Sequence, residues 1–146
     1  MLKYFLYFME DCIFCKIVKG EIPCSKVYED ENFLAFLDIS PVNKGHVLVV
    51  PKEHSENIFD SDNDVLRKIG PVLKKVSIAV KKGVDADGIV ISQNNGKDAG
   101  QAVMHLHFHI MPRFKEDGLR HWPGEQDKYS DEEMKELSEK IKEKIN

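Results

Sequence analysis

The chain has 146 residues, of which 42% are hydrophobic and 32% are charged. This length suits one domain with its own core, and the composition is typical of a soluble globular protein, which argues against a disordered or membrane-spanning chain. The formal net charge is −4 and the 21 basic residues are spread along the chain, so no nucleic-acid partner is expected.

Residues 1–10 are expected to be an N-terminal extension, with Met9 as an alternative start to Met1. The apolar run in this segment is too short to span a membrane, and no signal-peptide cleavage site follows it. The three cysteines are an odd number, which argues against a disulfide framework. We therefore expect a cytoplasmic protein that does not bind membranes.

The first predicted elements are a short helix and three strands. Residues 11–20 have helical apolar spacing and end at a glycine. Residues 25–29 and 33–39 read as strands on either side of an acidic turn, the pattern of a β-hairpin. Residues 46–51 form a β-branched run that ends at a proline, which predicts a third strand.

Two further helices are predicted. Ser61 is placed to cap a long helix whose apolar positions keep helical spacing as far as Gly83. Pro71 should kink or interrupt this helix, because proline lacks the backbone N–H that the helix uses. The last helix is predicted to begin with a capping box that pairs Ser130 with Glu133.

Two more strands are predicted at residues 88–93 and 105–112, joined by a polar loop that contains Gly96 and Gly100. The strands then pair mainly with their sequence neighbours. This arrangement predicts an α+β fold with an antiparallel sheet.

Three of the six histidines lie within five residues, at His105, His107 and His109. On a strand, their side chains would project to one face about 7 Å apart. Such a row suits a metal site or acid, base and nucleophile chemistry, and a solvated strand face is the remaining alternative. Glycines in the preceding loop permit the positive φ values with which backbone N–H groups contact phosphate oxygens, and this favours phosphate chemistry.

The sequence Ala-Gly-Gln at residues 99–101, followed after three residues by His-Leu-His-Phe-His-Ile-Met-Pro-Arg, resembles the signature of the histidine triad (HIT) superfamily. The resemblance extends over residues 11–113, including residues 37–41 and 45–52, and it points to the Hint-like branch. It implies a five-stranded antiparallel sheet with one long helix and short terminal helices. It also implies a homodimer whose sheet continues across both protomers.

The resemblance places a HIT domain at residues 11–115, with residues 116–146 as the tail and last helix of the same domain. Trp122 in this tail is expected to pack against the domain or to contact the partner subunit. His46 resembles a position that supports the triad, and a core histidine at a strand start is the alternative.

The resemblance assigns His107 as a nucleophile that attacks the α-phosphorus of a purine nucleotide. A nucleotidyl-histidine intermediate would form and then be hydrolysed by water. The carbonyl of His105 would select the tautomer of His107, and His109 would contact the phosphate and assist the leaving group. Backbone N–H groups and imidazoles stabilise the phosphoryl charge in this scheme, so no magnesium is required.

The resemblance also implies a set of nucleotide-binding residues, with the ribose near residues 38–39 and the phosphate near residues 94–109. Asp38 can alternatively cap a turn. Many members of the family have serine or threonine where this chain has Ala102, so one hydroxyl contact is missing and only the backbone N–H remains. The full set is Asp38, Ile39, Asn94, Gly100, Gln101, Ala102, His107 and His109.

Cys12 and Cys15 form a Cys-x-x-Cys pair, a spacing that suits tetrahedral zinc but is weak support alone. Resemblance to zinc-containing HIT-like proteins implies that His54 and His105 complete the site. A site with four protein ligands holds one structural zinc per chain and leaves no open position for catalysis. Two reduced, metal-free thiols in the core are the alternative.

The resemblance therefore implies a nucleotide hydrolase or nucleotidyl transferase, and first of all a nucleoside phosphoramidase that cleaves a P–N bond. AMP, GMP or their conjugates would be its partners. A dinucleoside polyphosphate hydrolase of the Fhit type is one alternative, because Met-Pro-Arg at residues 111–113 is found in that branch too. A zinc-stabilised nucleotide-binding module with little turnover is another, although it would not need a central histidine nucleophile.

Overall fold

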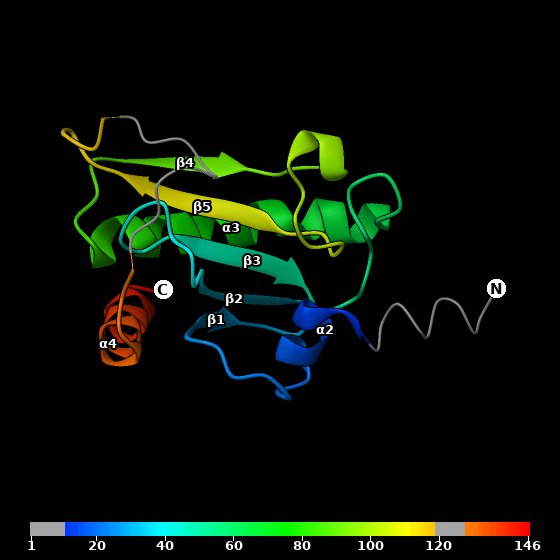
Figure 1. The fold of residues 1–146 in the computed structure, drawn as a ribbon, viewed down its shortest axis with the longest axis horizontal. Helices are drawn as coiled ribbons and strands as arrows, with labels where there is room; N and C mark the ends of the chain where they lie inside the picture. The colour runs from blue at the N-terminus through cyan, green and yellow to red at the C-terminus, as the bar shows by residue number, and fades with distance from the viewer. Residues whose placement is uncertain (1–10, 119–127) are drawn as a thin grey trace.

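The computed structural model describes residues 11–118 and 128–146. The predictions for residues 1–10 and for Trp122 lie outside these described residues. The elements are α2 (Ile13–Val18), β1 (Lys26–Glu29), β2 (Phe33–Leu37), β3 (Val47–Pro51), α3 (Asn63–Gly83), β4 (Gly88–Ser92), the 3₁₀ turn η1 (Lys97–Ala99), β5 (Phe108–Arg113) and α4 (Asp131–Lys142) (Figure 1).

The strands form one five-stranded sheet in the order β1-β2-β3-β5-β4. All four pairings are antiparallel, which confirms the predicted α+β class and the β1–β2 hairpin. β3 does not pair with β4, the next strand in the chain. It pairs with β5, and β4 lies beyond β5 at the edge of the sheet. His109 consequently lies on an interior strand, between Leu48 of β3 and Ser92 of β4.

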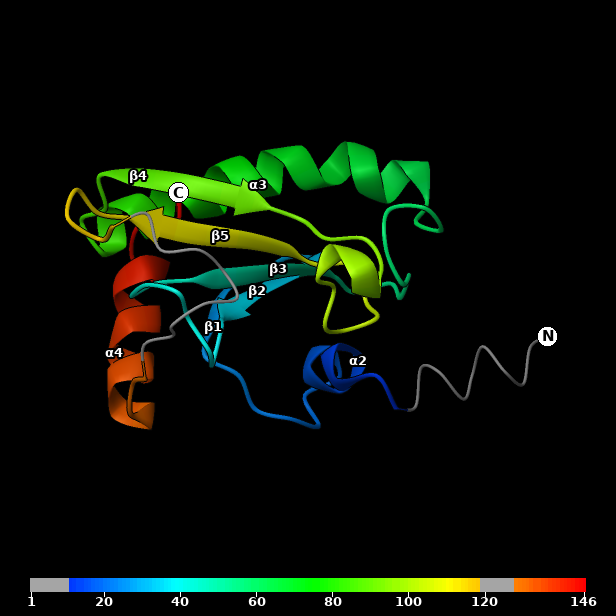
Figure 2. The ribbon, with the colours of Figure 1, turned by 45° about the horizontal axis from the view of Figure 1, so that its top comes forward.

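The centre of the sheet is covered on both faces, and β2 and β3 are buried along their whole length. Figure 2 shows α3 along one face and α2 on the opposite side. Alternate residues of β2 divide between the two sides, because side chains alternate along a strand. Phe33 and Ala35 join the core under α3 and α4, whereas Leu34 and Phe36 join Phe14 of α2.

The long helix differs from its prediction at its N-cap. Asp62, not Ser61, is the N-cap, and its carboxylate accepts the N–H of Asp64 at 2.6 Å. The helix continues through Pro71 without an interruption, and a kink at this residue stays a prediction. Burial of one helical face, including Val76 and Val80, offsets the cost of about 3 kcal/mol that proline imposes on a helix interior.

The last helix begins as predicted, with a reciprocal capping box. Ser130 Oγ accepts the N–H of Glu133 at 3.2 Å, and Glu133 Oε2 accepts the N–H of Ser130 at 2.7 Å. Among the residues that the structure describes, no helix has both the length and the apolar character needed to cross a bilayer.

The predicted strand at residues 105–112 is wrong at its start, because β5 begins only at Phe108. The N–H of Leu106 donates to the carbonyl of Ser55 at 2.8 Å, and the N–H of His105 donates to that of Val103 at 2.9 Å. These bonds to loops replace a strand ladder. The three histidines therefore do not share one strand face.

Candidate active site and Cys/His cluster

A cavity of about 300 Å³ lies between α2, the end of β2 and the histidine segment. This volume is at the lower end of the range for small-molecule sites. Its apolar wall comes from α2 and the sheet, and its polar side from Asp38 and two histidines. Of the predicted nucleotide-binding residues, five line the cavity: Asp38, Ile39, Ala102, His107 and His109.

His107 is held in one tautomer. Its Nδ1 lies 2.6 Å from the carbonyl oxygen of His105, and a carbonyl can only accept, so Nδ1 carries the proton. Burial lowers the pKa of His107, opposed by this bond to the His105 carbonyl. The neutral ring therefore keeps Nε2 unprotonated, the state that a nitrogen nucleophile requires.

A second chain of contacts determines the tautomer of His109. The N–H of Val42 donates to His46 Nδ1 at 3.1 Å, so the proton of neutral His46 is on Nε2. That Nε2 lies 2.9 Å from Nδ1 of His109, which must accept. Neutral His109 consequently carries its own proton on Nε2.

The two cavity histidines therefore present opposite functions. His107 offers a lone pair on Nε2, and His109 offers an N–H donor, with their ring centroids 5.1 Å apart. Burial, with the neighbouring His46 and His107, lowers the pKa of His109 to about 3, so this donor is a neutral imidazole. The arrangement can combine attack on a phosphorus atom with hydrogen bonding to its oxygens or leaving group.

Asp38, His46 and His109 also bring potential ligand atoms within 4.8 Å of one another. A metal at this cluster would need the lone pair of His46 Nε2, but Val42 already uses the other ring nitrogen as an acceptor. The ring would have to lose its one remaining N–H proton and bind the metal as an imidazolate. This cluster is therefore built to orient a proton and not to hold a metal.

The glycine loop has the predicted backbone conformation, with φ of 90° at Gly96 and 84° at Gly100. Asn94, Gly100 and Gln101, however, are not among the residues that line the cavity. Asn94 Nδ2 donates to the carbonyl of Ala99 within the loop. The predicted phosphate contacts of these three residues stay a prediction.

The Gln101 side chain is buried, and both the oxygen and the nitrogen of its amide bond to backbone groups. Its Oε1 accepts the N–H of Gly96 at 2.7 Å. Its Nε2 donates to the carbonyls of Glu56 at 2.6 Å and Val103 at 2.9 Å. The amide thus connects the glycine loop to residues 54–56, a contact that the motif alone did not indicate.

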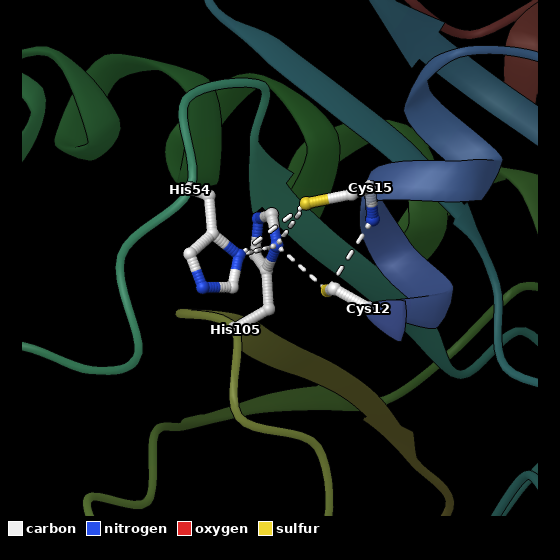
Figure 3. Close-up of side chains that lie close together, drawn as sticks. All are labelled: Cys12, Cys15, His54 and His105. Carbon is white, nitrogen blue, oxygen red and sulfur yellow. Dashed lines mark hydrogen bonds between the residues drawn. The ribbon is translucent and has the colours of Figure 1, made fainter. Parts of the chain in front are cut away.

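The four residues predicted as zinc ligands come together (Figure 3). Nδ1 of His105 lies 3.4 Å from Cys12 Sγ, 3.6 Å from Cys15 Sγ and 3.1 Å from His54 Nδ1. Cys15 Sγ lies 3.3 Å from His54 Nδ1. We call Cys12, Cys15, His54 and His105 the Cys/His cluster.

The geometry of the Cys/His cluster fits a tetrahedral metal ion. Bonds of about 2.3 Å to sulfur and 2.0–2.1 Å to nitrogen put neighbouring ligand atoms about 3.3–3.8 Å apart, close to the separations found. His105 Nε2 donates to the carbonyl of Pro51 at 2.8 Å, which leaves the Nδ1 lone pair directed into the cluster. Burial and the neighbouring Cys12 raise the pKa of the Cys15 thiol to about 12, and a bound cation would deprotonate it.

Local structure places the two thiols. Cys12 is the N-cap of α2, and its Sγ accepts the N–H of Cys15 at 3.4 Å. The helix ends at Val18, and Gly20 follows the C-cap Lys19 with a φ of 78°, which allows the chain to reverse without steric cost. One short turn of helix therefore presents both sulfur atoms to the same point.

The fold and the site define an α+β protein in which three alternate histidines connect a cavity to a Cys/His cluster. A row of this kind characterises histidine triad proteins. The HIT domain family model matches residues 19–116, and the chain belongs to this family.

Relatives in sequence and structure agree with this assignment. Adenosine 5′-monophosphoramidase hnt1 of Schizosaccharomyces pombe is 46% identical over 136 residues, 92% of this chain and 98% of the relative. A hypothetical histidine triad nucleotide-binding protein from Sulfolobus tokodaii has a TM-score of 0.83 at 39% identity, covering 92% of this chain and 91% of that one. A Zn-bound histidine triad family protein from Mycobacterium smegmatis has a TM-score of 0.80 at 34% identity, covering 94% of both chains.

Proposed function

We propose that this chain is a nucleoside phosphoramidase that cleaves the P–N bond of purine nucleoside 5′-phosphoramidates. The observation that carries the proposal is the set of contacts to His107, His46 and His109, from which it follows that His107 Nε2 has a lone pair and His109 Nε2 a proton. The similarity to the S. pombe phosphoramidase supports the same reaction class.

His107 Nε2 forms the new bond to the α-phosphorus while the bond from phosphorus to the amine nitrogen breaks. The His105 carbonyl, 2.6 Å from Nδ1 of His107, stabilises the charge that this ring gains. His109 donates a hydrogen bond to the phosphate or to the leaving nitrogen. In the first step the amine leaves with the Nε2 proton of His109, and in the second step water places its hydroxyl on phosphorus and returns a proton to His109, so one water molecule balances the whole reaction.

The cavity suits the nucleoside in its shape and polarity. Ile13, Phe14 and Ile17 supply an apolar wall for the base, and Asp38 supplies a carboxylate for the ribose hydroxyls. The scheme uses no magnesium, so we expect turnover of the zinc-loaded protein without added Mg²⁺.

Labelled adenosine 5′-phosphoramidate tests the mechanism directly. Wild-type protein should carry covalently bound AMP after quenching in alkaline denaturant, which preserves a bond between phosphorus and histidine nitrogen, and His107→Ala should carry none, with a loss of kcat on the order of 10³-fold or more. A wild type that never carries label and releases no AMP would contradict the enzyme. In that case the zinc-stabilised binding module would be the better description.

Initial rates on adenosine 5′-phosphoramidate and on a diadenosine polyphosphate separate the two hydrolase alternatives. We expect the higher kcat/KM for the phosphoramidate. A higher value for the diadenosine polyphosphate would instead assign the chain to the Fhit-type reaction.

The Cys/His cluster is proposed to hold one structural zinc per chain. Its four donors and their separations support this assignment, and the similarity to the Zn-bound M. smegmatis protein agrees with it. When bound, the ion would join α2, residues 54–56 and the histidine segment through four protein ligands. The clustered thiols also suit the reducing cytoplasm that the sequence predicts.

A homodimer is proposed through the sheet edge. β4 is an edge strand, and its residues Val90 and Ile91 are 41% and 46% exposed. An exposed apolar edge strand is a surface that a second copy can cover by continuing the sheet. Sedimentation should give twice the mass of one chain, and Val90→Lys should shift the protein towards the monomer.

A further inference from the structure

The Cys/His cluster draws its ligands from three segments that also build or support the cavity. Cys12 caps α2 and Cys15 lies within it, His54 belongs to the loop before α3, and His105 to the segment that continues to His107 (Figure 3). The segment with His105 continues directly into the cavity, and the other two segments reach it through separate contacts.

The first route is α2 and its aromatic ring. Phe14 stands between Cys12 and Cys15 on the helix and lines the cavity. Its ring meets that of His107 edge to face, with centroids 5.2 Å apart, and that of Phe36 at 5.7 Å. A helix of six residues is too short to be stable by itself, so its position depends on such tertiary anchors.

The second route is the loop that carries His54. The carbonyl of Ser55 accepts the N–H of Leu106 at 2.8 Å, which holds the histidine segment. The carbonyl of Glu56 accepts the Nε2 of Gln101 at 2.6 Å, and that side chain in turn accepts the N–H of Gly96 at 2.7 Å. One loop therefore positions both the histidine segment and the glycine loop.

We propose that the Cys/His cluster positions the nucleotide cavity, with Phe14 and Gln101 as the positioning residues, so that metal and nucleotide bind cooperatively. This inference rests on the proposed nucleotide function. Filling the cluster holds α2 against His107 and holds the 54–56 loop under the glycine loop. By thermodynamic linkage, a nucleotide must then tighten metal binding by the same factor as the metal tightens nucleotide binding.

Two titrations test the coupling in both directions. AMP is titrated by calorimetry into zinc-loaded and zinc-depleted protein, and zinc is titrated against a chelator with and without saturating AMP. Both should give the same affinity ratio, about five- to 150-fold. Equal AMP affinity in both forms would overturn the coupling alone, whereas no AMP binding to zinc-loaded protein would contradict the proposed function as well.

Amide hydrogen exchange shows whether the metal positions the cavity or only stabilises the domain. Zinc loading should increase protection in α2 and in residues 96–103, and leave α4 unchanged. AMP should protect the same two segments of the zinc-loaded protein. Loss of protection throughout the zinc-depleted chain, including α4, would overturn the proposal.

Variants that keep all four ligands test the two routes. Phe14→Leu and Gln101→Leu should each lower the affinity ratio by several-fold while the protein still binds zinc. Phe59→Leu is the matched control for the aromatic change, because Phe59 is 82% exposed and outside both sites. Gln93→Leu is the comparison for the amide: Gln93 is bonded to residues 94 and 95 and not to Glu56 or Gly96, so its loss should lower the ratio less than that of Gln101. An undiminished ratio in Phe14→Leu and Gln101→Leu would overturn these routes.

Discussion

His46 Nε2 lies 2.9 Å from His109 Nδ1, while the other ring nitrogen of His46 accepts the N–H of Val42 at 3.1 Å. A backbone amide thus determines the tautomer of His46, and His46 determines that of His109. The same interaction leaves His109 with a proton on Nε2, opposite in function to the unprotonated Nε2 of His107.

Replacing His46 should reduce kcat more than it changes KM. His46→Leu removes the donor to His109 and releases its tautomer, and we expect a loss of about 10- to 100-fold, the usual size for an orienting partner. His46→Gln keeps an acceptor for Val42 and a donor for His109, so it should recover much of the rate. Steady-state kinetics of both variants check this, and equal losses in both would contradict the tautomer argument.

The stability of the protein should fall as the pH falls below neutral. Burial lowers the pKa of both His46 and His109 to about 3, with Asp38 opposing this at His109. Their pKa in the unfolded chain is about 6.5, so the unfolded state binds more protons between these pH values and the free energy of unfolding decreases.

Urea unfolding at pH 7.5 and at pH 5.5 measures this dependence. His46→Gln removes one buried titrating group. The slope of its unfolding free energy against pH should therefore be smaller than that of the wild type, by at most the contribution of about one proton per chain. Equal slopes for wild type and variant would show that His46 does not contribute. Zinc content is measured at both pH values, so that metal release is recognised.

Metal retention should depend on the cluster cysteines and not on Cys24. Cys15→Ser removes a buried sulfur ligand, and bound zinc should fall from about one per chain to near zero. Cys24→Ser is the matched control, because Cys24 lines the cavity and lies outside the Cys/His cluster. Elemental analysis of both purified variants checks the result, and full zinc retention by Cys15→Ser would contradict the ligand assignment.

Ala102→Ser should strengthen nucleotide binding. Ala102 lines the cavity next to the glycine loop, and a serine hydroxyl there can donate to a phosphate oxygen. One such hydrogen bond contributes about 0.5–1.5 kcal/mol, so the Kd for AMP should fall about two- to tenfold. Ala99→Ser, in the same loop, is the control and should leave Kd unchanged. The same Kd for Ala102→Ser and wild type would show that the phosphate does not reach this position.

Much of this protein can be predicted from local pattern. Helical apolar spacing predicted α2 and the two longer helices, and β-branched runs bounded by turn residues predicted each strand that the structure describes, because these patterns follow from local backbone geometry. The Cys-x-x-Cys pair and the histidine row likewise identified the chemical groups. The ends of the elements were less predictable. Asp62 caps α3 in place of the neighbouring Ser61, and β5 begins only at Phe108 because the preceding backbone N–H groups bond to loops and not to a strand.

The division of labour among the three histidines was decided only by the tertiary structure. A strand pattern would put His105, His107 and His109 on one face. Instead, bonds to residues 51 and 55 turn His105 towards the cysteines of α2, and His46 sets the tautomer of His109. These partners lie about 50 to 90 positions away in the chain, so they meet the histidines only once the chain has folded.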